Sequence, residues 1–232
     1  NEGILPLSST LFDSLYGFTS VPENKVVMQP RTDIGTNAHG YSYVDLGLTS
    51  GTLWATMNVG ATSETDYGSY FQWGDTVDKK NADCSWASYK YCNGTENSLT
   101  KYCNISYYGT VDNKITLDLV DDAARVNMGG DWKMPTTALM EELISETNMV
   151  PTTKGWKFTS KTDPSKYIFI PASGYRSGSS FNHQGRYGFV WITLLESSSN
   201  GLANCLHFDS NSISATSWTT DRCFGLTVRG VL

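Results

Sequence analysis

Short runs of aromatic and β-branched residues, most of them four to seven residues long, recur along this chain between turn signals rich in Gly, Asn, Asp and Ser. Runs of this kind are typical of short β-strands. They fall at 43–46, 52–57, 68–73, 156–159, 167–170, 187–193, 202–208 and 224–228. Two segments have helical character: 120–127, which closes at Gly129-Gly130, and the segment that opens after Thr136, a suitable N-cap. Because strands and helices do not alternate regularly, the pattern predicts an α+β fold with a small antiparallel or mixed sheet, two main helices and many loops.

The hydrophobic pattern changes near residue 40. Residues 1–40 show weak periodicity and contain three of the seven prolines, whereas apolar runs recur from Tyr41 onward. We therefore expect an N-terminal extension, 1–40, followed by one domain, 41–232. A chain of 232 residues is long enough for such a domain to bury a full core.

Charge and hydropathy exclude two classes of partner. The net charge is −6 and the 17 Lys and Arg residues are scattered, which argues against a nucleic-acid partner. Neither a run of about 20 apolar residues nor a signal peptide is present, so we expect no direct membrane insertion and, if the protein is exported, a signal already removed. A surface carried by Ser, Thr, Asn and Gly suits an extracellular β-rich protein.

The residues that carry most enzyme chemistry form no recognised motif. The five cysteines include no CxxC pair; Cys92 and Cys103 are placed to bridge a loop, although a buried free thiol is the commoner state. Cys205, His207 and Asp209 alternate as if on one face of a strand, but any exposed strand has this property. No serine lies in a GxSxG motif, and the aspartates at 118–122 lack calcium-loop spacing. We expect no catalytic residue, metal or cofactor.

The last third of the chain has the most unusual composition. No lysine follows Lys166, and eleven serines lie between Ser173 and Ser217, interleaved with aromatic residues and Asn. This composition resembles an antibody paratope, in which aromatic residues supply contact area and Ser and Asn supply adaptable hydrogen bonds. A merely solvated set of Ser-rich loops is the alternative. Five of the seven tryptophans are expected in the core, and Trp218, between Ser217 and Thr219, is expected at the surface.

Several short sequence motifs occur in this chain in the order known from one large protein family. They are YVDLGL (43–48), SGTLWAT (50–56), YGSYFQWG (67–74), DDAA (121–124), GGDWKMPT (129–136), PASGYR (171–176) and YGFVW (187–191). Over residues 41–232 the chain resembles the Fibrobacter succinogenes major paralogous domain family of Bacteroidetes. The resemblance implies a C-type-lectin-like fold of the formylglycine-generating-enzyme type. Leu139 stands where the broader group carries the Glu of a capping box, and no motif of the enzymes surrounds Cys205 or Cys223.

Variable proteins of diversity-generating retroelements share this fold and place their diversified positions near the C-terminus. The scaffold positions of the related pattern are kept in this chain at Gly188, Trp191, Leu206, Phe208, Gly225, Val228 and Arg229. The residues between them depart toward Phe, Val, Ile, Leu, Cys and His. Directed mutation at adenines produces such changes, and so do ordinary drift and repacking of the core.

The hypothesis that follows is a secreted or cell-surface, non-catalytic ligand-binding protein whose region 174–229 forms the binding face. Its partner is expected to be a protein or glycan on another cell, a phage or a host surface. The residues predicted to contact it are Phe181, His183, Arg186, Tyr187, Phe189, Ile192, Leu194, Asn204, His207, Asp209, Trp218, Asp221 and Phe224. One alternative is a structural or adhesive module, such as a fimbrial tip or cell-wall component, that makes its contacts through residues 1–40. Another is an oxidase-like or hydrolytic enzyme using Cys205, Cys223 or His207.

Overall fold

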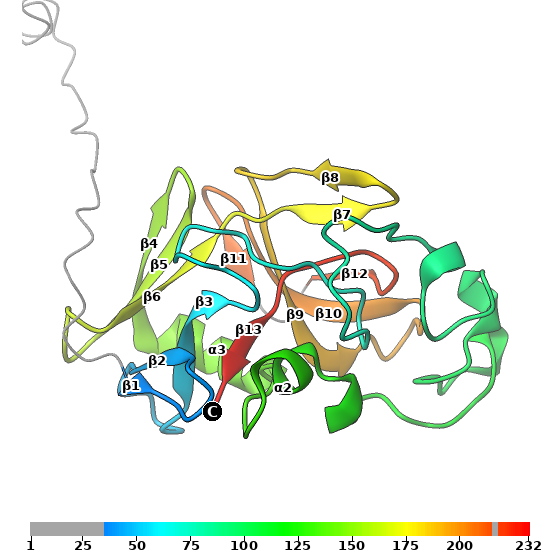
Figure 1. Cartoon of the computed structure of the whole chain (residues 1–232), viewed down its shortest axis with the longest axis horizontal. Helices are drawn as coiled ribbons and strands as arrows, with labels where there is room; N and C mark the ends of the chain where they lie inside the picture. Colours follow the sequence, from blue (N-terminus) through cyan, green and yellow to red (C-terminus); the bar gives the residue numbers. More distant parts are fainter. Residues whose placement is uncertain (1–34, 215–217) are drawn as a thin grey trace, which may run out of the picture.

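The computed structural model describes residues 35–214 and 218–232 as small antiparallel sheets joined by long loops (Figure 1). The α-helices within these ranges are α2 (Ala123–Met128) and α3 (Thr137–Glu146). The strands are β1 (Gly35–Thr36), β2 (Ser42–Asp45), β3 (Leu53–Asn58), β4 (Thr147–Thr152), β5 (Gly155–Ser160), β6 (Tyr167–Pro171), β7 (Tyr175–Ser177), β8 (Ser180–Asn182), β9 (Gly188–Leu195), β10 (Leu202–Phe208), β11 (Ile213–Ser214), β12 (Thr219–Asp221) and β13 (Arg229–Val231). Short 3-10 turns are η1 (Trp86–Ser88), η2 (Glu96–Ser98), η3 (Ser106–Tyr108) and η4 (Leu119–Asp121). The predicted α+β, loop-rich class with two helices is confirmed.

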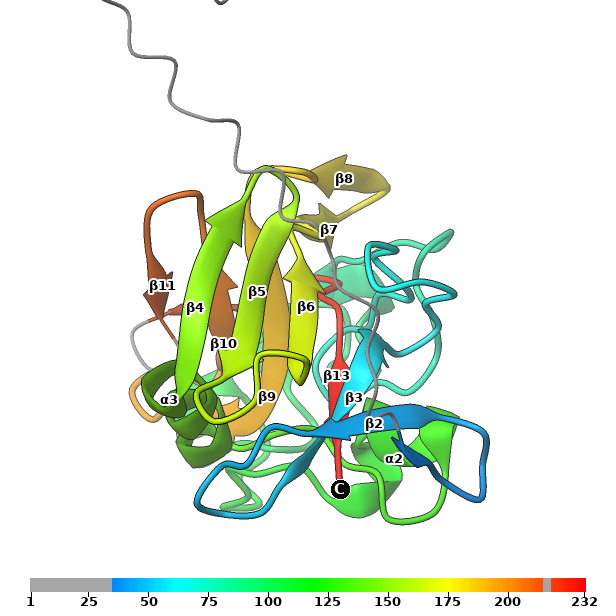
Figure 2. The same ribbon diagram turned by 90° about the vertical axis from the view of Figure 1, so that its left-hand side faces the viewer.

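The first sheet, in the order β1-β2-β3-β13, brings the last strand of the chain against one of the first (Figures 1 and 2). β13 pairs with β3 in antiparallel register, with Val231 opposite Trp54. Residues 35–36, within the segment expected to be an extension, form β1 and pair with β2. The rest of that extension, 1–34, lies outside the described residues.

A second sheet, β4-β5-β6, follows α3 and lies beside β9 and β10 (Figure 2). Helix α3 begins as the sequence predicted, because the Thr136 side chain accepts a hydrogen bond from the Leu139 amide at 3.3 Å. Its buried face carries Met140 and Leu143. On its other side Glu142 and Glu146 accept hydrogen bonds from the 49–50 turn, which fixes the β2–β3 connection to the helix.

The sheet of β9 and β10 separates two apolar cores. Side chains alternate between the faces of a strand. On β9, Val190 and Ile192 enter the core shared with β5, β6 and α3. Phe189 and Trp191 point to the other core, which contains α2 and the end of the chain. β9 therefore contributes one of its faces to each core.

The sequence prediction was wrong at three elements. The segments 68–73 and 224–228 form no extended strand; they meet at the single pair Phe71 and Leu226, whose amides and carbonyls bond reciprocally at 2.8 and 3.0 Å. The helix predicted for 120–127 begins later, because Asp122 accepts a hydrogen bond from the Arg125 amide and acts as the N-cap of α2. Its predicted end at Gly129 is confirmed, since this residue adopts a φ of 70°.

The tryptophans and cysteines lie largely as expected. Trp54, Trp73, Trp132, Trp156 and Trp191 are buried, whereas Trp218 is 43% exposed. All five cysteines are free thiols, so Cys92 and Cys103 do not form the bridge considered above. No helix in residues 35–214 or 218–232 has both the length and the apolar character needed to cross a membrane.

Candidate functional site

The centre of the candidate site is a pair of rings on neighbouring strands. Phe189 of β9 lies directly opposite His207 of β10 in the antiparallel register. Opposed side chains on one face of such a pair are close enough for their rings to touch. Their ring centroids are 4.7 Å apart, and both residues are largely buried, at 5% and 9% exposure. They form the floor of the site.

The β7–β8 hairpin adds a third ring. Gly174, just before β7, adopts a φ of +60°, and a Cβ atom there would lie 2.1 Å from the Asn182 carbonyl oxygen, so the turn requires glycine. This turn places Tyr175 edge-on to Phe189, with centroids 5.4 Å apart. On its other side Tyr175 stacks on Phe224 at 5.2 Å, with the rings 16° from parallel.

A tight turn before β9 supplies two more rings. His183 adopts a positive φ of 58°, and its carbonyl accepts hydrogen bonds from the amides of Arg186 and Tyr187. The His183 and Tyr187 rings meet at 4.8 Å, and Tyr187 lies 5.7 Å from His207. The turn therefore joins the hairpin to the floor of the site.

Trp218 completes the set. Its indole stacks on the His207 imidazole with centroids 4.0 Å apart and planes 15° from parallel. Since Trp218 remains 43% exposed, the stack leaves much of the indole open to solvent. The contacts connect seven rings in one continuous network: Phe224, Tyr175, His183, Tyr187, Phe189, His207 and Trp218.

These rings surround an open hollow of about 640 Å³, here called the aromatic hollow. Its remaining lining residues are Asp209, Ser212, Ile213, Ser214, Thr219 and Thr220. Within the part of the chain that the structure describes, the His207 nitrogens, the Tyr187 hydroxyl and the Trp218 Nε1 make no hydrogen bond. The hollow thus combines apolar contact area with hydrogen-bonding groups that make no bond to the described residues.

The charge of the aromatic hollow is low. Burial lowers the pKa of His207 below its usual range, and the nearby Asp209 carboxylate opposes this shift only in part, so the imidazole is neutral at pH 7. Asp209 is held by its own turn, accepting hydrogen bonds from the Asn211 and Ser212 amides. These bonds lower the pKa of Asp209 and keep it ionised.

The segment that carries Phe224 is anchored from below by a buried arginine. Arg222 is fully buried; its guanidinium donates to the Tyr89 hydroxyl at 2.7 Å and to three backbone carbonyls, those of Lys101, Tyr102 and Asn200. It also lies over the Trp73 ring at 5.0 Å. These contacts fix the end of β12 against the loops before it.

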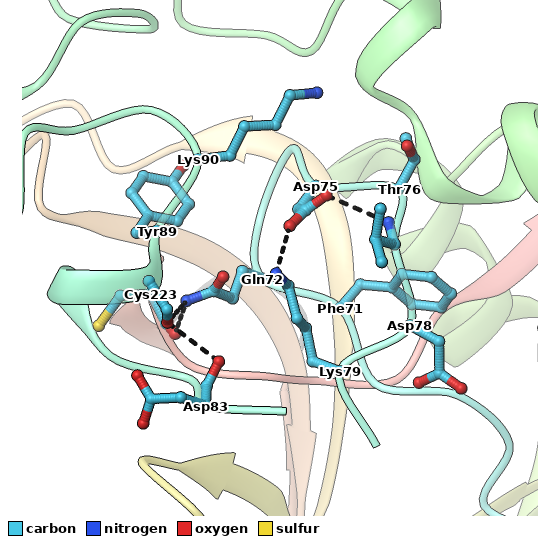
Figure 3. A network of polar contacts seen from close by, with 12 residues as sticks. Phe71, Gln72, Asp75, Thr76, Asp78, Lys79, Asp83, Tyr89, Lys90 and Cys223 are labelled. Atoms are coloured by element: carbon cyan, nitrogen blue, oxygen red, sulfur yellow. Dashed lines mark hydrogen bonds and ion pairs between the residues drawn. The ribbon is translucent and has the colours of Figure 1, made fainter. Parts of the chain in front are cut away.

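A second anchor is Gln72, whose side-chain amide donates to the Cys223 carbonyl at 2.8 Å (Figure 3). The same amide group reaches the Ser85 carbonyl at 3.2 Å. The 72–85 loop is held in its turn by the Lys79–Asp75 ion pair at 3.0 Å. Gln72 and Arg222 therefore position Phe224 within the ring network.

A second hollow, of about 360 Å³, adjoins the first and is here called the polar hollow. The two share Tyr187 and Asp209. Arg186 lies at the polar hollow, exposed, with its guanidinium 5.8 Å from the Tyr187 ring. The remaining lining residues come from the β4–β5 turn and the start of β5, from Ala172 just after β6, from Gly185 and from residues 208–211.

Eight of the thirteen residues that were predicted from the sequence to contact a ligand lie close together in the structure. Seven line the aromatic hollow: His183, Tyr187, Phe189, His207, Asp209, Trp218 and Phe224. The eighth, Arg186, lines the polar hollow together with Tyr187 and Asp209. These eight residues therefore lie at two adjoining hollows, and their contact with a ligand stays a prediction.

The other five residues lie elsewhere. Ile192 is fully buried, because it is on the opposite face of β9 from Phe189, and Asn204 is buried with its side-chain amide bonded to the Leu194 and Leu195 carbonyls. The expectation of exposure is wrong for these two, and it is also wrong for Phe189 and His207, which are buried in the floor of the aromatic hollow. Leu194 and Asp221 are half-buried and line neither hollow. Phe181 is 39% exposed but pairs with Arg176 and Tyr70 on the far side of the hairpin from Tyr175.

Sequence reasoning missed several lining residues. Tyr175 lies within the PASGYR motif and was not predicted to contact a ligand, although its place beside the glycine turn makes it a central ring of the network. Ser212, Ser214, Thr219 and Thr220 belong to the Ser- and Thr-rich tail, so their composition carried a signal but their position did not.

The thiols considered for catalysis are not part of either hollow. Cys205 is fully buried and Cys223 is 2% exposed, and burial raises the pKa of both well above the usual range of a cysteine. A thiol with a raised pKa is a poor nucleophile at neutral pH. Among the described residues no group of three or more His, Cys, Asp or Glu side chains is arranged to hold a metal ion.

Comparison with protein-family models, with curated proteins and with solved structures found no match for this chain. The site is therefore interpreted from its own geometry.

Proposed function

We propose that this protein is a non-catalytic ligand-binding protein, secreted or displayed on a cell surface, and that the aromatic hollow is its binding site. The observation that carries this proposal is the network of seven rings around an open hollow, in which the His207 nitrogens, the Tyr187 hydroxyl and the Trp218 Nε1 make no hydrogen bond within the described residues. Polar atoms at the edge of an open apolar hollow that make no bond within the described residues are available to a ligand.

The rings suit binding for energetic reasons. Aromatic side chains supply large contact areas with few rotatable bonds, and contacts of this type dominate many interfaces. Here the rings brace one another, as in the His207–Trp218 stack at 4.0 Å, so little ordering is required when a ligand binds. This braced surface favours a binding module over a solvated loop set.

We further propose the C-type-lectin-like fold of the formylglycine-generating-enzyme type, as the family resemblance implies. Two helices and small sheets support a loop-rich region, and the chain ends in β13 beside β3, which supports this assignment. The motif GGDWKMPT directly precedes α3, and the motif YGFVW includes the first residues of β9. Determination of an experimental structure and its comparison with that fold would test the assignment.

Diversification of the tail is the finer part of the proposal. The scaffold positions named in the sequence analysis, from Gly188 to Arg229, are all buried, as a fixed scaffold requires. Two residues that depart from the related pattern, Phe189 and His207, line the aromatic hollow. Three others, Val190, Ile192 and Cys205, fill the cores, where repacking accounts for them. A reverse-transcriptase gene beside a near-copy of the 3′ coding end, differing at adenines, would support diversification; its absence would leave ordinary adhesion.

The binding proposal is tested with the full chain immobilised and screened against glycan arrays and displayed peptides. Trp218→Ala and His183→Ala remove exposed rings from the hollow, and Tyr107→Ala removes a ring that is 69% exposed elsewhere. Loss of a central aromatic contact lowers affinity by about tenfold or more. We expect Trp218→Ala to lose binding and Tyr107→Ala to retain it. Equal binding by both variants would refute the site; dependence on residues 1–40 alone would favour the adhesive module.

A further inference from the structure

The neighbouring hollows are parts of one surface, because Tyr187 and Asp209 line both. Their chemistry differs. The aromatic hollow is lined by rings, small hydroxyl residues and one aliphatic side chain, Ile213. The polar hollow has the exposed guanidinium of Arg186 on its wall. A ligand that spans both therefore needs an apolar part and a part complementary to a cation.

Arg186 is unusual among the cations of the last third. No lysine follows Lys166, and the other three arginines there, Arg176, Arg222 and Arg229, are buried and donate to backbone carbonyls. Arg186 is exposed, and its guanidinium has no carboxylate or hydrogen-bond partner among residues 35–214 and 218–232; its contact is with the Tyr187 ring. A guanidinium offers several donors in a planar fork that matches a carboxylate.

The lining of the aromatic hollow favours a side chain over a sugar. A sugar ring carries several hydroxyl groups, and burying any of them without a hydrogen-bond partner makes the binding free energy less favourable. The hollow contains no Asn, Gln, Glu, Lys or Arg, and its one carboxylate, Asp209, is bonded by its own turn. An aromatic or aliphatic side chain can cover the rings while the backbone amides and carbonyls of the same peptide reach the unbonded polar atoms of His207, Tyr187 and Trp218.

The spacing fits an extended chain. The Arg186 guanidinium lies 5.8 Å from the Tyr187 ring, and that ring lies 5.7 Å from His207 in the floor of the aromatic hollow. In an extended peptide, alternate side chains project from the same face at a separation of roughly 7 Å. Because the Tyr187 ring neighbours both Arg186 and the floor of the aromatic hollow, a peptide side chain bound beside that ring leaves the side chain two residues further along within reach of Arg186.

We propose that the two hollows together bind an extended polypeptide segment that inserts an apolar side chain between Tyr187 and Trp218 and presents a carboxylate, two residues away, to Arg186. This inference rests on the proposed binding function and specifies its ligand class. The carboxylate belongs either to an acidic side chain or to a chain end, and both sources offer the same chemistry to the guanidinium.

The test begins with a random seven-residue peptide library displayed on phage and selected on the immobilised full chain. We expect enrichment of an aromatic or aliphatic residue two positions from Asp or Glu. The selected peptides are then synthesised with free and amidated C-termini and their Kd values measured by fluorescence polarisation. A peptide whose Asp is changed to Asn, and one whose C-terminus is amidated, identify which carboxylate is bound.

Arg186→Gln is the matched protein variant, and Lys133→Gln, which removes an exposed charge beside β13, is its control. We expect Arg186→Gln to weaken the selected peptides by about five- to tenfold and to have little further effect on their Asn forms. Lys133→Gln should leave binding unchanged.

Three results would overturn the inference: enriched peptides without a carboxylate, equal weakening of acidic and amide peptides by Arg186→Gln, or selection of glycans but no peptide. If Trp218→Ala abolishes binding while Arg186→Gln does not, the proposed function stands and the peptide inference fails. If neither variant changes peptide affinity, the aromatic hollow itself is not the site.

Discussion

Replacing Arg222 should destabilise this fold strongly, because the side chain is buried and holds several loops together. Its guanidinium is fully buried and bonds three backbone carbonyls, those of Tyr102 at 2.8 Å and of Lys101 and Asn200 at 3.1 Å. In Arg222→Met these carbonyls lose their donor, whereas the Tyr89 hydroxyl keeps its own bond to the Trp73 carbonyl. A buried acceptor without a partner costs about 1–3 kcal/mol, so with partial relaxation the loss is about 3–5 kcal/mol.

That loss is a large share of a typical domain stability of about 5–15 kcal/mol. For a domain of this size each kcal/mol shifts the Tm by about 2–4 °C, which predicts a decrease of roughly 6–20 °C. Circular dichroism melting and urea unfolding measure it, with exposed Arg186→Met as the control that should leave the Tm unchanged. Arg222→Lys should fall between the two. A Tm for Arg222→Met within about 2 °C of the parent would refute the role of Arg222 as an anchor.

Three further predictions follow from groups near the cores and the site. His207 has a pKa lowered by burial, so the unfolded chain takes up a proton first on acidification; its contribution to stability is complete above about pH 6.5 and is lost as the pH falls through the folded-state pKa. Urea titrations between pH 7.5 and 4.5 should show this loss in the parent and not in His207→Asn; identical profiles would contradict it. Burial raises the pKa of Asp121, but hydrogen bonds from Lys101, Tyr102, Tyr91 and Lys90 outweigh burial and hold that pKa below its usual range. Asp121→Asn should therefore cost about 3–5 kcal/mol at pH 7, an effect that shrinks as the pH falls below 3.8, and an undiminished difference at pH 2.5 would disprove the charge contribution. Gly188→Ala places a Cβ atom 1.9 Å from the Phe208 ring, so we expect a loss of about 1–3 kcal/mol in thermal unfolding, and a neutral result would show that β9 is not packed against Phe208 as described.

Predictions from the sequence were correct where interactions between residues close together in the chain determine the structure. Strand β10 has the predicted bounds, 202–208, and α3 begins at its Thr136 cap. Trp218 could be predicted at the surface because its neighbours are Ser and Thr without apolar alternation. Each of these predictions depends on residues within a few positions in the chain.

Predictions failed where distant segments decide the outcome. Residues 68–73 and 224–228 have the composition of strands, yet the only bridge between these two segments is the pair Phe71 and Leu226. Arg222, between Asp221 and Cys223, carries no local sign of burial; its acceptors come from loops more than 20 residues distant in sequence. Which distant segments contact one another could not be predicted from the local sequence around these residues.

One error in the site prediction was avoidable. Phe189 and Ile192 were both predicted to contact ligand on a segment that was itself predicted to be a strand, although residues three positions apart on a strand face opposite sides. Applying that alternation retains Phe189 and removes Ile192, as the structure does. Tyr175 and Thr219 were beyond such reasoning, since their place beside β9 and β10 depends on the hairpin and on β12 pairing.

The central claim is that ligand covers the aromatic hollow, and Trp218 reports on it directly. Trp218 is 43% exposed, five of the other tryptophans are buried, and Trp86→Phe removes the remaining half-buried one. In that background, acrylamide quenching of tryptophan fluorescence monitors chiefly the Trp218 indole. At saturating concentrations of a peptide or glycan recovered from the screen, the account predicts that the quenchable fraction falls toward that of Trp218→Phe. Unchanged quenching at saturation would show that the ligand binds elsewhere.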